Sequence, residues 1–243
     1  MTARGRDVTD EESDRSETLS EALRAVRERI GEAARRAGRS SETVTLVAVS
    51  KTVAVQRVVE AEQAGVRDFG ENHAAELRRK APLVPSARWH FLGTLQRGTV
   101  RHVADAAVVV HSGEPGGAVE ALARRSAARG RVMDVLAQVD FTGRRQGTDP
   151  ADLPAFVEHL HTLGGIRPVG LMTIPPLTAD PREARPYFGR LRDLRDGMVA
   201  DWPGLVELSM GMSADYDVAV EEGATMVRVG TALFGHRPAP PKR

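Results

Sequence analysis

The stretch TVTLVAVSKTV, residues 43–53, sets the expectation for the whole fold. Apolar and β-branched residues dominate positions 43–49, which is typical of a strand buried on both faces, as the strands of parallel sheets are. The run then ends on Ser50 and Lys51. A parallel strand that finishes on an amine predicts a sheet whose carboxyl-terminal edge carries the chemistry.

The same unit, an apolar run followed by an amphipathic stretch, recurs along the rest of the chain. Eight such units with short connections predict a single (β/α)8 barrel of the TIM type, with an extra N-terminal helix that starts at Thr18 and ends near Gly38. A doubly wound open sheet is the competing fold, but the Gly-x-Gly-x-x-Gly sequence typical of its first turn is absent. The expected strands are 43–49, 66–70, 87–93, 106–112, 132–141, 166–174, 205–211 and 225–230, and the expected helices between them are 55–64, 72–81, 96–104, 117–129, 151–163, 181–199 and 214–222.

The composition limits the class of protein. Lys and Arg number 34 against 33 Asp and Glu, so a net charge of +1 gives no general attraction to nucleic acid or to a membrane. There is no Cys, which excludes disulfides and a Cys nucleophile, and no apolar run long enough to span a bilayer. We expect no metal site, since His159 and His161 do not share a helix face. We therefore expect a cytoplasmic monomer with a disordered polar tail (1–16), one barrel domain (17–237) and a Pro-rich tail (238–243).

Polar residues collect at the carboxyl ends of the expected strands, where a barrel places its active site. Glycines and hydroxyls near the last two strand ends could hold a phosphate, because Gly lets backbone N–H groups approach an oxyanion. The alternative reading is that they are turn glycines and helix caps. The strand-end residues are Lys51, Glu71, Asn72, His90, His111, Gln138, Met172, Thr173, Ser209, Arg228, Gly230 and Thr231.

Lys51 suggests a covalent role. Burial in a barrel mouth and a nearby cation both favour the neutral amine, which is a nucleophile toward aldehydes and forms Schiff bases. A ligand with an aldehyde at one side and a phosphate at the other would use Lys51 together with the phosphate site, and pyridoxal 5'-phosphate (PLP) is such a ligand. The alternative is a lysine that extends to solvent from a strand end.

Five stretches between about residues 43 and 237 form a recognisable set: LVAVSKTV, FGENHAAEL, WHFLGTLQ, GLMTIPP and the ungapped ELSMGMSADYDVAVEEGATMVRVGTALFGHR. In these stretches the chain resembles the pyridoxal phosphate homeostasis protein family, PLP-binding single-barrel proteins similar to the N-terminal domain of bacterial alanine racemase. The cofactor contacts that it implies are Lys51 for the internal aldimine, Arg228 for the pyridine nitrogen, Ser209, Gly230 and Thr231 for the phosphate, and Asn72, His90 and Met172 for the pocket wall.

Three stretches depart from the family pattern. LQRGT, with Gly98 and Thr99, replaces LQ-x-Asn-Lys after the third strand. The fifth strand ends in QVD, with Asp140, where QVN is common, and RRQG follows where a lysine is common. These changes concern contacts made by the two loops and leave Lys51 and Arg228 in place.

The resemblance implies a PLP-binding protein of vitamin B6 homeostasis that buffers PLP or delivers it to apo-PLP enzymes. Arg228 is a permanent cation with donors only, so it weakens the pyridine ring as an electron sink. Tyr187 and Tyr216 lie in expected helices, and neither is expected to supply a base on the opposite face. We therefore expect a carrier rather than an enzyme. A fold-type III PLP enzyme, either a racemase or a decarboxylase, is the main alternative, and a barrel that binds a phosphorylated metabolite and uses Lys51 only as a charge is the other.

Overall fold

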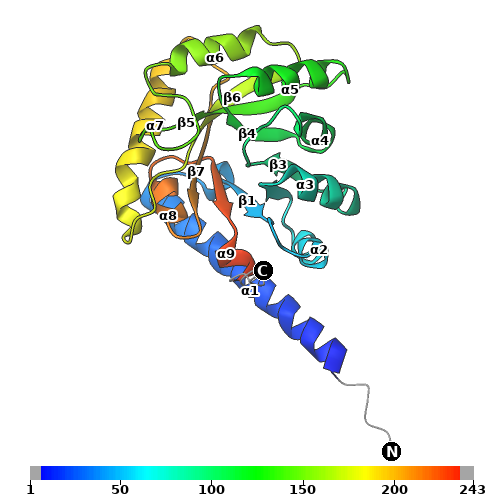
Figure 1. Ribbon diagram of the computed structural model, residues 1–243. Helices are drawn as coiled ribbons and strands as arrows, with labels where there is room; N and C mark the ends of the chain where they lie inside the picture. Colours follow the sequence, from blue (N-terminus) through cyan, green and yellow to red (C-terminus); the bar gives the residue numbers. More distant parts are fainter. Residues whose placement is uncertain (1–6, 236–243) are drawn as a thin grey trace, which may run out of the picture.

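The eight strands form one closed parallel barrel in which they follow one another in chain order (Figure 1). The computed structural model describes residues 7–235, and their side chains from Thr18 onward. β8 pairs with β1, with Leu46 opposite Val227, which closes the cylinder. This confirms the predicted (β/α)8 barrel and excludes the open sheet. The strands are β1 (Thr45–Val49), β2 (Asp68–Glu71), β3 (Arg88–Phe91), β4 (Val109–Gly113), β5 (Met133–Val139), β6 (Ile166–Thr173), β7 (Glu207–Met212) and β8 (Met226–Val229).

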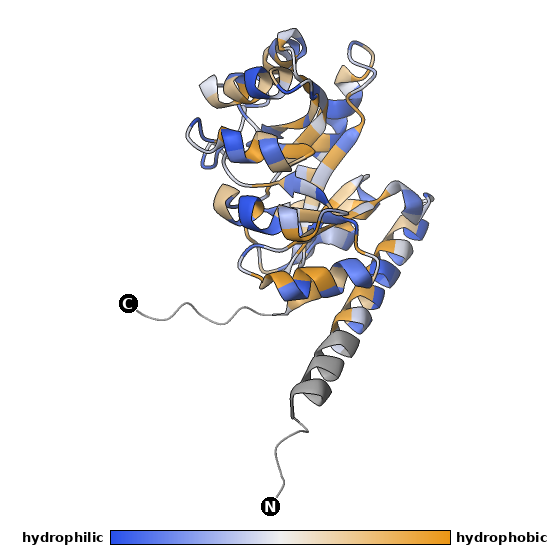
Figure 2. Ribbon diagram, turned by 90° about the vertical axis from the view of Figure 1, so that its right-hand side faces the viewer, coloured by the Kyte–Doolittle hydropathy of each residue, from blue (hydrophilic) through white to orange (hydrophobic). Residues whose placement is uncertain are grey.

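Helices surround the barrel and connect each strand to the next (Figure 1). Apolar residues of the helices belong to the same buried cluster as those of the strands, and hydrophobic and hydrophilic residues alternate along the helices (Figure 2). They are α2 (Val55–Gln63), α3 (Ala74–Lys80), α4 (Val100–Ala106), α5 (Gly117–Ala127), α6 (Leu153–Thr162), α7 (Arg185–Met198), α8 (Tyr216–Glu221) and α9 (Thr231–Phe234), with 3-10 turns η1 (Ser41–Thr43), η2 (Ala81–Leu83) and η3 (Pro181–Ala184). None of the helices in the described part of the chain has the length and apolar character needed to cross a bilayer.

Alternation along the strands divides the buried residues into two sets. In β5, Val135 and Ala137 belong to the large apolar cluster shared with the helices. Leu136, between them, belongs to a separate small cluster with Val109 and Met172. Because successive side chains of a strand point to opposite faces, this small cluster lies inside the barrel. The polar side chains of His90, His111 and Ser209 share that interior and connect by hydrogen bonds to Arg228.

The N-terminal helix α1 (Asp7–Arg36) begins earlier than expected. The backbone is helical from Asp7, so the disordered tail predicted for residues 1–16 does not extend over 7–16. Residues 1–6, and the predicted tail at 238–243, lie outside the described residues. The expected apolar stripe is buried, with Leu19, Leu23, Val26 and Ile30 each at most 4% exposed.

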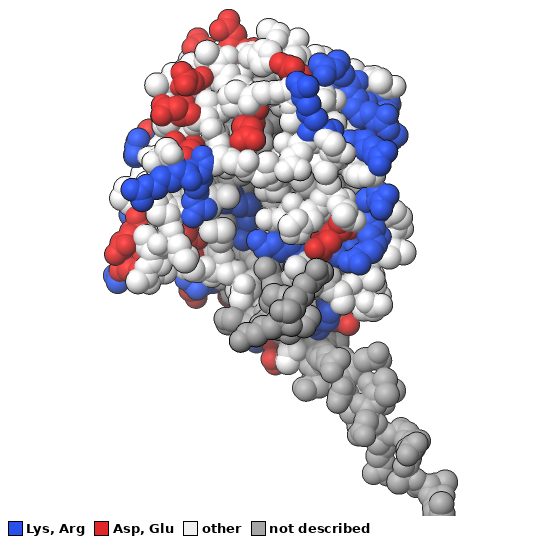
Figure 3. All heavy atoms as spheres, in the orientation of Figure 1, with Lys and Arg blue, Asp and Glu red and all other residues white. Residues whose placement is uncertain are grey.

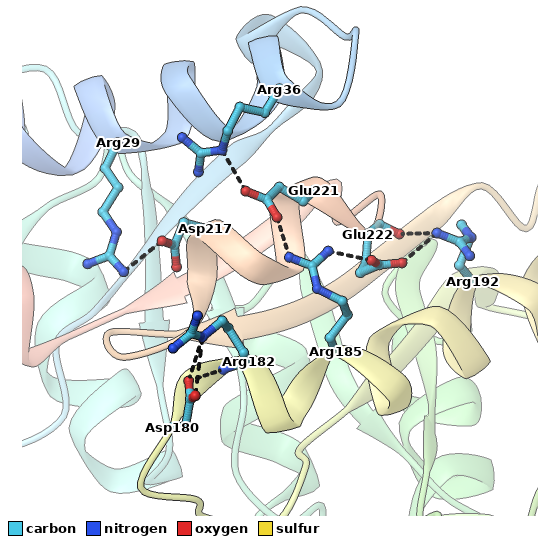
Figure 4. Close-up of polar contacts among 9 residues, drawn as sticks. All are labelled: Arg29, Arg36, Asp180, Arg182, Arg185, Arg192, Asp217, Glu221 and Glu222. Carbon is cyan, nitrogen blue, oxygen red and sulfur yellow. Dashed lines mark hydrogen bonds and ion pairs between the residues drawn. The ribbon is translucent and has the colours of Figure 1, made fainter.

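Ion pairs fasten α1 and α7 to α8 (Figure 4). The acidic pair Glu221–Glu222 is only partly exposed, and arginines from both neighbouring helices contact it. Arg185 of α7 donates to both carboxylates. The contacts join Arg29 to Asp217 at 2.8 Å, Arg36 to Glu221 at 2.7 Å and Arg192 to Glu222 at 2.7 Å. Arg36 of α1 and Arg185 of α7 thus meet at Glu221, which connects the N-terminal helix to two helices from much later in the chain.

Candidate functional site

A cavity of about 590 Å³ opens at the carboxyl ends of the strands. Its walls combine apolar side chains with three cations, Lys51, Arg145 and Arg228, and one carboxylate, Asp215. This volume falls within the usual range of small-molecule sites, roughly 300–1,000 Å³. An excess of positive charge in a partly enclosed cavity favours an anionic ligand. The other lining residues are Val49, Asn72, Leu92, Met172, Ile174, Pro175, Pro176, Leu177, Thr178, Pro181, Met212, Ser213, Ala214, Gly230 and Thr231.

Positive charge is also present outside the cavity. Basic side chains gather on the side of the molecule formed by α4 and α5 (Figure 3). Part of this surface is already paired, since Arg125 and Arg129 lie 3.5 and 2.9 Å from Asp105. These arginines belong to the exterior of α5 and its end, so they do not contribute to the cavity.

Lys51 follows β1 in a turn, and its half-buried side chain lines the cavity. The next residue, Thr52, has φ 64°, in the left-handed region that β-branched residues rarely adopt. Such a conformation costs about 1–2 kcal/mol and persists only where neighbouring groups enforce it. The turn that presents Lys51 is therefore held in place by contacts outside itself.

Those contacts come from Lys80, which is fully buried. Its Nζ donates to the Ser50 carbonyl at 2.6 Å, to Glu71 Oε1 at 2.7 Å and to Glu76 Oε2 at 2.8 Å. The same Glu76 oxygen accepts the Thr52 N–H at 2.8 Å. The backbone groups of Ser50 and Thr52, on both sides of Lys51, are thus bound to one cluster, which fixes the position of the Lys51 backbone.

Burial raises the pKa of Glu71, although hydrogen bonds from Lys80 and Ser50 oppose the rise. Glu71 Oε2 has no hydrogen-bond partner and Oε1 has two. The contribution of Lys80 and Glu76 was missed from the sequence. Their spacing of four residues on α3 is a signal for an ion pair, but surface helices carry the same spacing.

Arg228 of β8 enters the cavity from the barrel interior. One of its terminal amines donates to Ser209 Oγ at 2.6 Å and the other to the Thr173 carbonyl at 2.9 Å. Burial lowers the pKa of Arg228 to about 10, and Asp215 partly offsets this effect. The side chain therefore stays a cation near neutral pH, and its two bonds set the plane of the guanidinium.

Small residues form one wall of the cavity at the start of α9. Gly230 and Thr231 line it, as does Ser213 from the loop after β7. Ser213 Oγ accepts the N–H groups of Gly230 at 3.1 Å and Ala232 at 3.3 Å. This wall presents the hydroxyls of Ser213 and Thr231, which are donors suited to phosphate oxygens. Ser213 was not among the residues singled out from the sequence.

Six of the eight sequence-predicted contact residues line the cavity: Lys51, Asn72, Met172, Arg228, Gly230 and Thr231. Ser209 and His90 do not. Both are 0% exposed and lie within the barrel below the cavity. Ser209 Oγ is bonded to Arg228 and to His111 Nδ1, and His90 is bonded to His111 and to Asp68. In this structure their polar atoms bond to protein partners, and their contact with a cofactor stays a prediction.

The departures near β5 have a structural effect. Asp140 Oδ2 accepts the Arg145 N–H at 2.7 Å, and its Oδ1 accepts from the backbone and hydroxyl of Thr142. Burial would raise the pKa of Asp140, but these hydrogen bonds outweigh it and lower the pKa. Asp140 thus orders the loop that brings Arg145 to the cavity wall. Neither Tyr187 nor Tyr216 lines the cavity, and Tyr216 is buried beneath Arg29.

Comparisons with known proteins agree with this geometry. The family model "Alanine racemase, N-terminal domain" matches residues 22–238. The chain is 42% identical over 224 residues to a pyridoxal phosphate homeostasis protein of Pseudomonas aeruginosa, covering 90% of this chain and 96% of that protein. It is 38% identical over 222 residues to that of Aquifex aeolicus, covering 89% and 97%. The structure of PipY of Synechococcus elongatus PCC7942 with PLP bound superimposes with a TM-score of 0.79 at 35% identity, covering 89% of this chain and all of that one.

Proposed function

This chain belongs to the pyridoxal phosphate homeostasis protein family, and on that premise we propose that it binds PLP in the cavity at the carboxyl ends of its strands. One observation carries the proposal: Lys51, Arg228 and the Gly230–Thr231 turn line the same cavity although they lie far apart in the chain. An amine, a guanidinium and a phosphate-sized group of donors are the set of groups that a phosphorylated aldehyde with a pyridine ring requires.

The cavity residues would divide the ligand between them. Lys51 would hold PLP as a reversible lysine aldimine, in which the amine condenses with the aldehyde carbon and one water is released. Ser213, Gly230 and Thr231 would bind the phosphate, and Asn72 and Met172 would contact the ring from the wall. When bound, PLP supplies an aldehyde and an electron-accepting ring. Arg228 can only donate, so it would keep the ring nitrogen unprotonated and that electron sink weak.

We propose that this protein buffers or delivers PLP rather than catalysing a reaction. The relatives bear the name of homeostasis proteins and not of enzymes. No tyrosine lines the cavity in the described part of the chain, so no phenol there could serve as a second base across from Lys51. Because the aldimine hydrolyses reversibly, the same bond that retains PLP would also allow its release to an apo-PLP enzyme.

The test is PLP titration followed by borohydride reduction and peptide mapping. We expect a visible absorption band on titration and a single reduced adduct on Lys51. The chain has three lysines, Lys51, Lys80 and Lys242, so the assignment is simple. Lys51→Arg keeps the charge but cannot form the adduct and is the matched control. A protein that stays colourless at saturating PLP, or an adduct that persists in Lys51→Arg, would refute the proposal.

Delivery needs its own experiment. The loaded protein is mixed with an apo-PLP enzyme in the presence of a trap that consumes free PLP, and reactivation is followed over time. We expect reactivation to persist with the trap for the wild type and to be lost for Lys51→Ala. Reactivation that the trap abolishes in the wild type would support buffering without direct delivery. Exchange of the amino-acid α-proton in deuterated water at enzyme-like rates would favour a racemase instead.

A further inference from the structure

A continuous chain of hydrogen bonds crosses the interior of the barrel. It begins at Arg228, which donates to Ser209 Oγ at 2.6 Å, and continues from Ser209 to His111 Nδ1 at 2.7 Å. His111 Nε2 lies 2.8 Å from His90 Nδ1, and His90 Nε2 lies 2.9 Å from Asp68 Oδ1. The three middle residues are all 0% exposed. The proposed PLP site does not use them, and buried polar side chains of this kind call for an explanation.

With one proton on each imidazole, the carboxylate end of this chain fixes the direction of the bonds between Asp68 and Ser209. A guanidinium only donates, so Ser209 Oγ accepts from Arg228. A carboxylate only accepts, so His90 Nε2 carries a hydrogen toward Asp68. With one proton on each imidazole, His90 Nδ1 must then accept from His111 Nε2, and His111 Nδ1 must accept from the Ser209 hydroxyl. Burial, followed by the nearby His90 and Arg228, places the pKa of His111 well below its usual value, which agrees with a neutral ring.

The two ends also lie on opposite faces of the barrel. Arg228 lines the cavity at the carboxyl ends of the strands. Asp68 is the first residue of β2, at the other end, where it lines a separate cavity of about 420 Å³. Its side chain is 13% exposed, and its oxygen lies 3.6 Å from Arg88 Nε. A change made at Asp68 therefore leaves the residues of the proposed PLP site untouched.

We propose that Ser209, His111, His90 and Asp68 form a positioning relay that holds the guanidinium of Arg228 in one orientation toward the bound ligand. The inference rests on the proposed function, because it names what orients the residue placed beside the ring nitrogen. Each donor in the relay has one acceptor, so the relay has a single arrangement as long as Asp68 accepts at its end. Removing that acceptor leaves a buried His90 N–H unpaired and makes the reverse arrangement accessible.

The first experiment reads the relay without PLP. Nitrogen-15 NMR of the PLP-free protein reports the protonated nitrogen of each imidazole, and resolved Nη–H signals report an Arg228 side chain that does not rotate freely. We expect protonated Nε2 and bare Nδ1 for both His90 and His111, and slow rotation of Arg228. Protonated Nδ1 on either ring would overturn the relay.

The second experiment uses substitutions at the far end. We expect Asp68→Ala to broaden the Arg228 Nη–H signals, to shift the absorption maximum of bound PLP and to raise its Kd roughly fivefold. Asp68→Glu keeps a carboxylate that only accepts and is expected to preserve the wild-type signals. Arg88→Gln removes the exposed partner of Asp68 and is the matched control, with no expected effect.

The outcomes separate the relay from the proposed function. If the wild type does not bind PLP, the proposed function fails, and the Arg228 signals of the PLP-free variants still decide on the relay. Ser209→Ala breaks the relay at its upper end, while Ser209→Thr keeps the hydroxyl and is expected to restore it. Sharp, unchanged Arg228 signals in both Asp68→Ala and Ser209→Ala would refute the relay.

Discussion

Replacing Lys80 by Met should strongly destabilise the protein. Met keeps most of the unbranched side chain but removes the ammonium that three acceptors share, two of them on the buried residues Ser50 and Glu71 and one on the partly buried Glu76. Glu71 would keep only the Ser50 hydroxyl, at 2.8 Å, and the Ser50 carbonyl would lose its side-chain donor. Removing one partner of a buried ion pair costs about 3–5 kcal/mol, a large part of the roughly 5–15 kcal/mol that stabilises a typical domain. We expect the free energy of unfolding to fall by about that amount at pH 7.

Urea unfolding followed by circular dichroism measures this loss. Arg79→Met, on the exposed side of the same helix, is the matched control and should change stability by less than about 0.5 kcal/mol. Burial already raises the pKa of Glu71, and the loss of Lys80 raises it further. A carboxyl group with a raised folded-state pKa costs stability as the pH rises above its unfolded pKa, so the deficit should be smaller at pH 5 than at pH 7. Adding Glu71→Gln should recover part of the loss. A deficit below about 1 kcal/mol, or one that grows toward pH 5, would contradict this account.

Three further changes test other parts of the structure. Gly211→Ala should lower unfolding free energy by at least about 2 kcal/mol, because φ is 88° and the new Cβ would lie 2.6 Å from a side chain of α8; Gly143→Ala, at φ 66° with open space around it, should cost only about 1 kcal/mol by urea unfolding. Arg185 of α7 lowers the pKa of Glu221, so the ionised carboxylate stabilises the fold above its unfolded pKa, and this stabilisation is lost as the pH falls through the folded pKa. The melting temperature of Glu221→Gln should therefore change less between pH 5 and pH 3 than that of the wild type. An equal change in both proteins would contradict the pairing. Thr231→Val should raise the Kd for PLP roughly fivefold in an absorbance titration, whereas Thr178→Val, elsewhere on the cavity wall, should not.

The barrel could be predicted from the sequence because its fold follows from the order of short segments along the chain. Apolar runs of strand length, each followed by an amphipathic segment, leave few alternatives to a cylinder of parallel strands. The expected first strand at 43–49 overlaps β1 at Thr45–Val49, and Lys51 follows it at the cavity as expected. Once the strand ends are known, the residues that reach the cavity at those ends follow from the architecture.

Depth inside the barrel could not be predicted in the same way. Ser209 and His90 lie in strands and face inward, but a sequence gives only the face and not the height of a side chain along the barrel axis. Whether each one reaches the cavity depends on how neighbouring strands are staggered. The roles of Lys80 and Glu76 could not be predicted for a related reason. Their spacing of four residues is typical of any ion pair on a helix surface, and only the packing of α3 against the turn at Lys51 buries the lysine and partly buries the glutamate.

The docking of α1 onto α8 has a consequence for synthesis on the ribosome. Helix α1 carries an apolar stripe, Leu19 to Ile30, and packs against α8, which is made much later in translation. β1 likewise waits for β8 before its second edge is covered. The nascent chain must therefore keep both α1 and β1 incomplete until α8 and β8 have been translated. Chaperone binding to this early segment should end only when β8, which follows α8 in the chain, has left the exit tunnel, because the barrel closes when β1 and β8 pair.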